Sequence, residues 1–304
     1  MSTPDIYFVH LGIKFNEVGK SINVFGVEIA FYGMIIAFGM LLAIGYVLLE
    51  AKRTNQKLDY YYDLAIAAII FGIIGARIYY VVFEWDLYKN DLLSIFNLRN
   101  GGLGIYGGII LGAIAAFVYC KIMNISFLKV TDTALPAVLI GQMIGRWGNF
   151  FNREAFGEYT NGLFAMRLKV EEVSGVISKT IEEHTINVSG VNYIQVHPTF
   201  LYESFACLVL FIIIMILKRH KRFHGEITCY YMIGYGIIRF MIESLRTDQL
   251  TFAIFKQRIA ISQVVSVTIV LIAFIMYLVF MKKNATEKDV EDREESKIRI
   301  FKEK

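Results

Sequence analysis

The chain has little charge, few prolines and few cysteines for its length. Only 19% of its 304 residues are charged, and it contains three prolines and three cysteines, whereas 56% of its residues are hydrophobic. Soluble domains carry about 25% charged residues, and a chain this apolar could not hide its side chains in one water-soluble core. The composition therefore predicts a polytopic membrane protein and excludes an ordinary soluble domain.

The sequence also lacks the patterns that hold metals, nucleotides or disulfides. Cys120, Cys207 and Cys229 lie in or beside apolar runs without metal-ligand spacing, so we expect buried free thiols. There is no Gly-Lys-Ser/Thr phosphate loop and no cluster of metal ligands, so we expect no cofactor and no metal. The N-terminus lacks the basic region and apolar core of a cleaved signal peptide.

The net charge of +4 is small, and the basic residues form short clusters between apolar runs. Such clusters set the orientation of membrane spans and are not the footprint of nucleic acid, so no nucleic-acid partner is expected.

Seven stretches are apolar enough to span a bilayer, which needs about 20 such residues. The predicted spans are Val27–Leu49, Tyr62–Phe83, Leu103–Ile122, Thr131–Arg146, Thr199–Leu217, Glu226–Leu245 and Ile259–Phe280. The fourth is short and contains Pro136, which leaves a re-entrant segment as an alternative. Basic clusters follow the first span at residues 52–57 and the fifth at residues 218–222, and both belong on the cytoplasmic side, so an even number of crossings separates them. The fourth segment is therefore predicted to span.

This orientation predicts an all-α, seven-span bundle with its N-terminus outside and its C-terminus inside. The predicted parts are spans one to four with an outer N-terminal segment (1–148), a small exported head (149–198), spans five to seven (199–281) and a charged cytoplasmic tail (282–304). Within the head, Phe164–Val170 and Ile186–Val196 carry β-branched and alternating residues, and Ser189-Gly190 is a plausible turn. We expect a small β-ribbon there.

Polar residues gather toward the outer ends of the predicted spans. The group comprises Arg77, Arg146, Arg239, Arg246, Tyr32, Tyr106, Glu203 and Glu243. A charged side chain at membrane depth is costly and is normally retained where it meets a polar partner or substrate. Because planar guanidinium groups match phosphate oxygens, the phosphate of an outer-leaflet lipid is the expected anion.

Arg239 and Glu243 are four residues apart and share a helix face, with Arg246 a turn further along. A basic, acidic, basic ladder would let Glu243 orient one arginine while leaving guanidinium donors free.

Simpler explanations remain open for single residues. Arg77 or Arg246 could merely extend to the interface, and Tyr32 or Tyr106 could belong to an aromatic belt. The segment GGLGIYGG around Tyr106 could serve only close helix packing. His184 is expected at the surface, and His197 is expected to be structural. A lipid or anion transporter and a seven-span receptor are alternative functions.

The stretch Gly145–Gly157, GRWGNFFNREAFG, resembles the signature of the bacterial prolipoprotein diacylglyceryl transferase family. Shorter matches follow the same order along most of the chain: AFYG at Tyr32, GARIYYV at Arg77, GGLGIYGG at Tyr106, HPTFLYE ending at Glu203, and GYGIIRFMIESLR ending at Arg246.

The resemblance implies a multi-pass enzyme of the bacterial inner membrane. It implies transfer of the diacylglyceryl group of phosphatidylglycerol to the lipobox cysteine of a preprolipoprotein, with release of glycerol phosphate. Arg146 matches the family's lipid-binding arginine and Arg239 an essential one. Further functional positions are matched by Asn149, Glu154, Gly157, Tyr32 and Glu243.

The chain departs from the family pattern at two places. Many members carry histidine where this chain has Tyr106, so a histidine base does not carry over, and Thr247 stands where a proline is usual. We expect Arg146 and Arg239 to stabilise the phosphate leaving group, with Glu243 positioning Arg239 and Tyr106 as a candidate proton acceptor. A tyrosine with a reference pKa of about 10 is a poor base at rest.

Overall fold

The computed structural model describes residues 3–98, 101–254 and 257–302. It contains two compact units: residues 1–43 with 135–304, and residues 44–134. Their boundaries fall inside two helices, α1 (Phe31–Arg53) and α5 (Phe127–Asn152). Each unit is described by itself below.

The described chain is mostly helical, and six of its helices are long and apolar enough to cross a membrane. These are α1, α2 (Leu58–Phe83), α4 (Ile105–Ile122), α5, α7 (Thr199–Leu217) and α9 (Ile261–Lys302). The protein is therefore a multi-pass helical membrane protein. The predicted sixth span corresponds to α8 (Glu226–Glu243), which is less apolar because it carries Glu226, Arg239 and Glu243.

Every predicted span except the fifth has different limits in the structure, and the fourth and the first are the most informative cases. The fourth is no short segment: α5 is a continuous helix of 26 residues with Pro136 inside it, long enough to cross a bilayer. The first begins later than predicted, because Val27–Ala30 forms strand β4, in which β-branched Val27 and Ile29 alternate with Glu28.

The prediction of an all-α fold needs correction, because the first unit contains a five-stranded antiparallel sheet of order β2-β1-β5-β7-β6. The strands are β1 (Ile6–Phe8), β2 (Ile13–Phe15), β5 (Met166–Lys169), β6 (Ile186–Val188) and β7 (Val191–Val196). The expected β-ribbon is present as β5, β6 and β7, and Ser189-Gly190 forms the predicted turn with positive φ at both residues. Two N-terminal strands extend it.

The sheet packs against one end of the helices of the first unit. Its core contains Ile6, Leu168 and Ile194 together with Phe150 near the end of α5 and Phe200 at the start of α7. This sheet-facing end is where the signature segment leaves α5.

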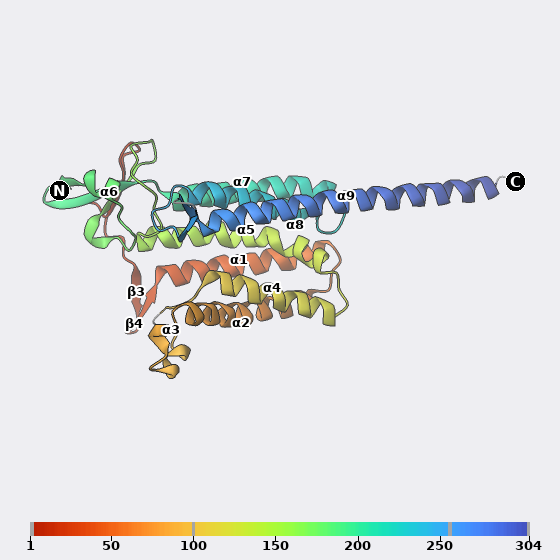
Figure 1. Ribbon diagram of the computed structural model, residues 1–304, viewed down its shortest axis with the longest axis horizontal. Helices are drawn as coiled ribbons and strands as arrows, with labels where there is room; N and C mark the ends of the chain where they lie inside the picture. The colour runs from red at the N-terminus through yellow and green to blue at the C-terminus, as the bar shows by residue number, and fades with distance from the viewer. Residues whose placement is uncertain (1–2, 99–100, 255–256, 303–304) are drawn as a thin grey trace. The chain divides into compact units, whose positions relative to one another are not determined.

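Further from the sheet, α5, α7 and α8 share an apolar core that includes Leu139, Cys207 and Ile227. Helix α8 also packs against α9, and Figure 1 shows α9 running on past α7 and α8 to the C-terminus. The charged tail is therefore helical as far as Lys302. The remaining elements of this unit are β3 (Ser21–Val24), η2 (Val170–Glu172), α6 (Lys179–Glu183), η3 (Lys218–His220), β8 (Thr251–Ile254) and β9 (Gln257–Ala260).

The second unit is built on the pair α2 and α4, which cross where Gly75 meets Gly107. A Cβ placed on Gly107 would lie 2.2 Å from the carbonyl oxygen of Gly75, so only glycine allows this approach. The interpretation of the Gly-rich segment as a helix-packing element is therefore confirmed for Gly107. The unit also contains α3 (Trp85–Tyr88) and η1 (Leu92–Phe96). Cys120, Cys207 and Cys229 are buried, as predicted, and none of them forms a disulfide within the described chain.

Candidate functional site

A buried glutamate joins two arginines at the sheet-facing end of the first unit. Glu203, in the second turn of α7, is only 1% exposed, and its Oε1 lies 2.8 Å from Nη2 of Arg146 on α5. Its Oε2 lies 3.6 Å from Nη1 of Arg239 on α8. Three helices thus bring together three members of the predicted group that are distant in the sequence: Arg146, Glu203 and Arg239.

Arg239 has a second acidic partner, and its ion-paired Nη1 makes no hydrogen bond among the described residues. Its Nη2 donates to Oε2 of Glu243, one helical turn away, at 2.5 Å. Its Nη1 is buried and has no hydrogen-bond partner among the described residues. Because a buried donor without a hydrogen bond is costly, this nitrogen is suited to an acceptor atom of a ligand.

The ion pairs hold both guanidinium groups in place, and the two arginine side chains stay partly exposed to solvent. The two arginines and the two glutamates balance in formal charge, which offsets the desolvation cost of burying them. The side chains of Arg146 and Arg239 are nevertheless 21% and 20% exposed. The arrangement can therefore present donors to a phosphate group while the carboxylates fix their geometry.

The predicted basic, acidic, basic ladder of Arg239, Glu243 and Arg246 does not extend to Arg246 in the structure. Helix α8 ends at Glu243, so Arg246 lies outside it and pairs with Asp248 through two hydrogen bonds of 2.9 and 2.7 Å. Burial opposes charge on both groups, but their mutual hydrogen bonds raise the pKa of Arg246 and lower the pKa of Asp248. Both therefore stay charged over the physiological range.

The signature segment turns sharply after α5. Asn149 donates to Oε1 of Glu154 at 3.0 Å across this turn, and Arg153 and Ala155 adopt positive φ. Thr199 at the start of α7 donates to the carbonyl of Ala155. The turn is therefore tied to the helix that carries Glu203.

Gly157 closes the turn against two other segments. Its N–H donates to the carbonyl of His197 at 3.0 Å, and Glu158 N–H donates to the carbonyl of Leu245 at 2.9 Å. A Cβ on Gly157 would lie 2.7 Å from that Leu245 oxygen, so a side chain does not fit. His197 joins these segments through its backbone, in agreement with a structural role, and burial lowers the pKa of its ring.

A cavity of about 410 Å³ opens beside this turn. It is lined by Asn149, Glu154, Ala155, Ser174, Gly175, Val176, Arg246 and Asp248. Three of the predicted binding residues therefore share one polar cavity.

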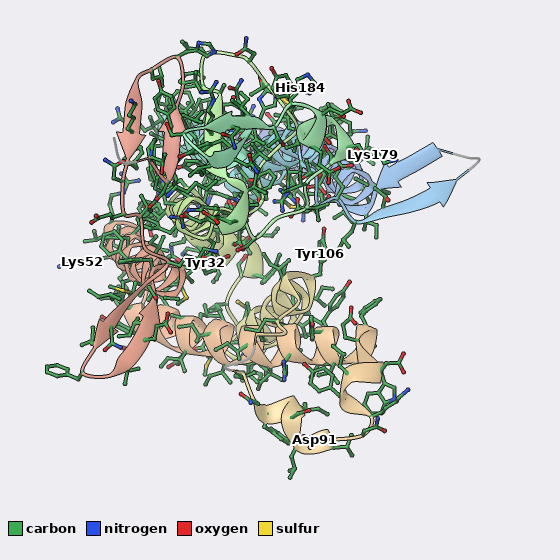
Figure 2. The ribbon with its side chains drawn as sticks, turned by 90° about the vertical axis from the view of Figure 1, so that its left-hand side faces the viewer. Tyr32, Lys52, Asp91, Tyr106, Lys179 and His184 are labelled. Atoms are coloured by element: carbon green, nitrogen blue, oxygen red, sulfur yellow. The ribbon has the colours of Figure 1, made fainter. Side chains whose placement is uncertain are left out.

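Tyr32 lies near the same signature, at the start of α1 (Figure 2). Its ring occupies the space that a side chain at Gly148 would fill, since a Cβ there would lie 2.5 Å from the ring. The glycine thus lets the tyrosine approach the backbone one residue before Asn149.

Two predicted site residues belong to the second unit. Arg77 is buried and donates to five backbone carbonyls, those of Ile95, Gly101, Gly102, Ser94 and Asn97, at 2.7 to 3.1 Å. Its donors are thus used to order a loop. Tyr106, labelled in Figure 2, is the second residue of α4, and its ring lies 6.3 Å from that of Tyr79. The substrate roles predicted for both stay predictions.

Sequence reasoning missed Tyr235, whose hydroxyl donates to Oε1 of Glu203 at 3.2 Å. It also missed Gln142, whose amide donates to Tyr231 at 3.1 Å and whose buried Oε1 has no hydrogen-bond partner within the described ranges. Tyr235 precedes Arg239 by four residues and Gln142 precedes Arg146 by four. Helical spacing from the two arginines was the signal that could have found them.

The fold and the site together define a multi-pass membrane protein with paired arginines where three helices meet a small sheet. The profile of the family described as prolipoprotein diacylglyceryl transferase matches residues 20–279. The chain belongs to this family.

Curated relatives agree with this assignment. A phosphatidylglycerol–prolipoprotein diacylglyceryl transferase from Finegoldia magna is 40% identical over 262 residues, covering 86% of this chain and 95% of the relative. One from Clostridioides difficile is 40% identical with the same coverage. One from Listeria innocua is 38% identical over 253 residues, covering 83% and 86%.

Proposed function

We propose that this protein is a transferase that moves the diacylglyceryl group of phosphatidylglycerol onto the cysteine thiol of a prolipoprotein lipobox. Family membership and the names of the relatives support the reaction class and both substrates. The observation that carries the proposal is the pair Arg146 and Arg239 on one buried glutamate, with Nη1 of Arg239 ion-paired to that glutamate but making no hydrogen bond among the described residues.

The proposed reaction is a displacement at the glycerol carbon of the lipid that bears the phosphate oxygen. A free thiol has a pKa of about 8.5, so a positive environment is needed to raise its thiolate fraction. The thiolate forms the S–C bond as the C–O bond breaks, and the electron pair stays with the departing glycerol phosphate. The thiol proton is taken up by a base or by the released phosphate, so atoms and charge balance.

Arg146 and Arg239 supply the electrostatic stabilisation in this proposal. Negative charge grows on the leaving phosphate oxygen, and fixed donors aimed at that charge lower the barrier. Glu203 and Glu243 hold the two guanidinium groups before the substrate arrives, so little reorganisation is needed during the reaction.

The other predicted residues have supporting roles in the proposal. Asn149, Glu154 and Gly157 shape the signature turn, and Tyr32 packs on it. Arg246 lines the polar cavity in which a headgroup or the lipobox peptide would lie. Tyr106 is retained as a hydrogen-bonding group for the thiol, and Arg77 as the residue that orders the loop before it.

We also propose that α8 spans the membrane as the sixth of seven spans, that the N-terminus lies outside and the C-terminus inside, and that the membrane is the bacterial inner membrane. Residues 149–198 would form the exported head between the membrane parts 1–148 and 199–281, with 282–304 as the cytoplasmic tail. A membrane-impermeant maleimide would test this. Ser189→Cys should react in intact spheroplasts, whereas Lys283→Cys should react only after permeabilisation, and the reverse pattern would invert the topology.

The activity is tested by incubating the purified protein with phosphatidylglycerol and a lipobox peptide. The expected result is a peptide whose mass increases by one diacylglyceryl group, with an equal amount of glycerol phosphate released. A cysteine-to-serine peptide is the matched control and should stay unmodified. Lipid movement across vesicles without any change in peptide mass would favour the transporter.

A further inference from the structure

The hairpin of β3 (Ser21–Val24) and β4 (Val27–Ala30) stands apart from the five-stranded sheet and leads directly into α1. Figure 1 shows it beside the start of that helix. Its register pairs Ile22 with Ile29 and Val24 with Val27, while Asn23 pairs with Glu28. Because alternate side chains point to opposite faces, the hairpin has an aliphatic face and a polar face.

The aliphatic face is exposed in the part of the chain that the structure describes. The side chains of Ile22, Val24, Val27 and Ile29 are all exposed, and Phe25 at the tip is 101% exposed. A two-stranded hairpin is marginal in water and gains stability only when its apolar face is packed. A contiguous exposed apolar surface of this kind marks an interaction site.

The turn carries an aromatic residue where the backbone disfavours one. Phe25 and Gly26 both have positive φ, at 51° and 83°, and Asn23 Oδ1 accepts a hydrogen bond from Gly26 N–H at 2.9 Å. Asparagine or glycine suits the first of these turn positions, and a bulky side chain there is strained. The phenyl ring is not packed against other side chains of the described chain. A contact with a surface outside the chain would therefore have to offset the backbone strain at Phe25.

The base of the hairpin is fixed to the signature helix. Phe31 N–H donates to the carbonyl of Lys20 at 2.9 Å, and the Phe31 ring lies 5.1 Å from that of Phe151 near the end of α5. Lys20 in turn donates to Ser174 at 2.9 Å. The hairpin is therefore held at a defined position relative to the site.

The neighbouring surface identifies the partner as lipid. Strand β4 ends at Ala30 and α1 begins at Phe31 without a linker. Helix α1 is a candidate membrane span whose Met34, Phe38 and Leu41 side chains are exposed, as expected for contact with acyl chains. The aliphatic face of the hairpin thus lies where the chain enters the bilayer.

We propose that this hairpin is an interfacial membrane anchor: Phe25 and the aliphatic face insert among the phospholipid headgroups and upper acyl chains, beside the start of α1. Interfacial elements with such surfaces bury their apolar side about 5–10 Å into this boundary, with the polar face toward water. The anchor holds the turn of the signature at a constant height over the outer leaflet. This inference depends on membrane insertion of α1 and is independent of the transfer chemistry.

Site-directed spin labelling in vesicles of phosphatidylglycerol and phosphatidylcholine tests the anchor. The three native cysteines are buried, so a label can be directed to Phe25→Cys or to the matched polar-face variant Glu28→Cys. Collision rates with oxygen, which partitions into lipid, and with a water-soluble nickel chelate are then compared. The oxygen-to-nickel ratio should be several-fold higher at position 25 than at position 28.

A second label on the aliphatic face, at Ile22→Cys, should also favour oxygen. Equal nickel accessibility at positions 22, 25 and 28 would overturn the proposal, since it would place both faces in water. Dipolar broadening between labels that increases with the protein-to-lipid ratio would also overturn it, because a second copy of the chain would then cover the face.

Discussion

At the residue scale, the site is organised around Glu203, whose carboxylate forms ion pairs with two arginines on different helices. A buried carboxylate in this position fixes the distance between the guanidinium groups and prevents their mutual repulsion. In the proposed mechanism it would set the spacing and orientation of the donors without touching the reacting atoms. Glu203 is a positioning residue in this account.

Replacing Glu203 with glutamine should separate its charge from its shape. The amide oxygen can still accept from one arginine, but its NH2 group repels the other, so the transfer rate should fall by about 10²-fold, as when one preorganised donor is lost. The rate is measured with the lipobox peptide at saturating phosphatidylglycerol. Glu171→Gln, at an exposed position of the head, is the control and should retain the wild-type rate.

Arg146→Lys tests whether planar geometry matters in addition to charge. Lysine keeps the positive charge but has a compact ammonium group that does not match two phosphate oxygens at once. We expect a higher KM for phosphatidylglycerol together with a lower kcat. Wild-type values for both constants would show that a point charge suffices at this position.

At the element scale, glycines set how closely helices approach in the second unit. Gly107 on α4 and Gly75 on α2 meet through their backbones, and the loop before α4 is ordered by Arg77. Tyr106, predicted as a candidate proton acceptor, lies in this part of the chain. The close packing of α2 against α4 explains the glycine next to Tyr106, independently of the role of the tyrosine.

Gly107→Ala should destabilise the α2–α4 pair, because its Cβ would meet the Gly75 oxygen at 2.2 Å. Relieving that contact requires the helices to separate, and overpacking of this kind typically costs about 1–3 kcal/mol. Thermal denaturation in detergent should show a lower midpoint. Gly112→Ala on the same helix meets Ala68 O at an ordinary 3.9 Å and should leave the midpoint unchanged.

An ion cluster around Asp5 adds to the backbone pairing of strand β1 with β5. The Asp5 carboxylate is bonded by Lys169 at 2.6 Å and by Val18 N–H at 2.7 Å, with Arg153 of the signature 3.8 Å away. Burial opposes the charge, but these partners outweigh it and lower the pKa of Asp5 below 3.8. The cluster therefore links the N-terminus to the signature turn.

This shift predicts that acid weakens the N-terminal attachment. A carboxyl group with a depressed folded-state pKa stabilises the fold above its unfolded pKa and loses that effect as pH falls through the folded value. The protection factors of the β1 and β2 amides, which are corrected for the intrinsic pH dependence of exchange, should therefore fall below about pH 4. In Asp5→Asn exchange should be faster at neutral pH and lose this acid dependence; an unchanged acid dependence in that variant would assign it to another group.

At the scale of the whole molecule, apolar length and β-branched alternation predicted most of the helices and the β5–β7 strands. The partners of that ribbon escaped prediction because β1 and β2 have three residues each, too few to show a period. Charge and depth predicted that Arg146, Glu203 and Arg239 would come together. Tyr235 and the pairing of Arg246 with Asp248 did not follow, since they depend on where α8 ends and how its faces pack.

The most direct test of the account is the transfer rate of Arg239→Ala in proteoliposomes containing phosphatidylglycerol and a lipobox peptide. Arg219→Ala, at an exposed position outside the site, provides the matched loss of charge. The account predicts a rate about 10²–10³ times lower for Arg239→Ala, with normal membrane insertion, and a nearly unchanged rate for Arg219→Ala. Equal rates for the two inserted variants would contradict the claim that the paired guanidinium groups stabilise the leaving phosphate.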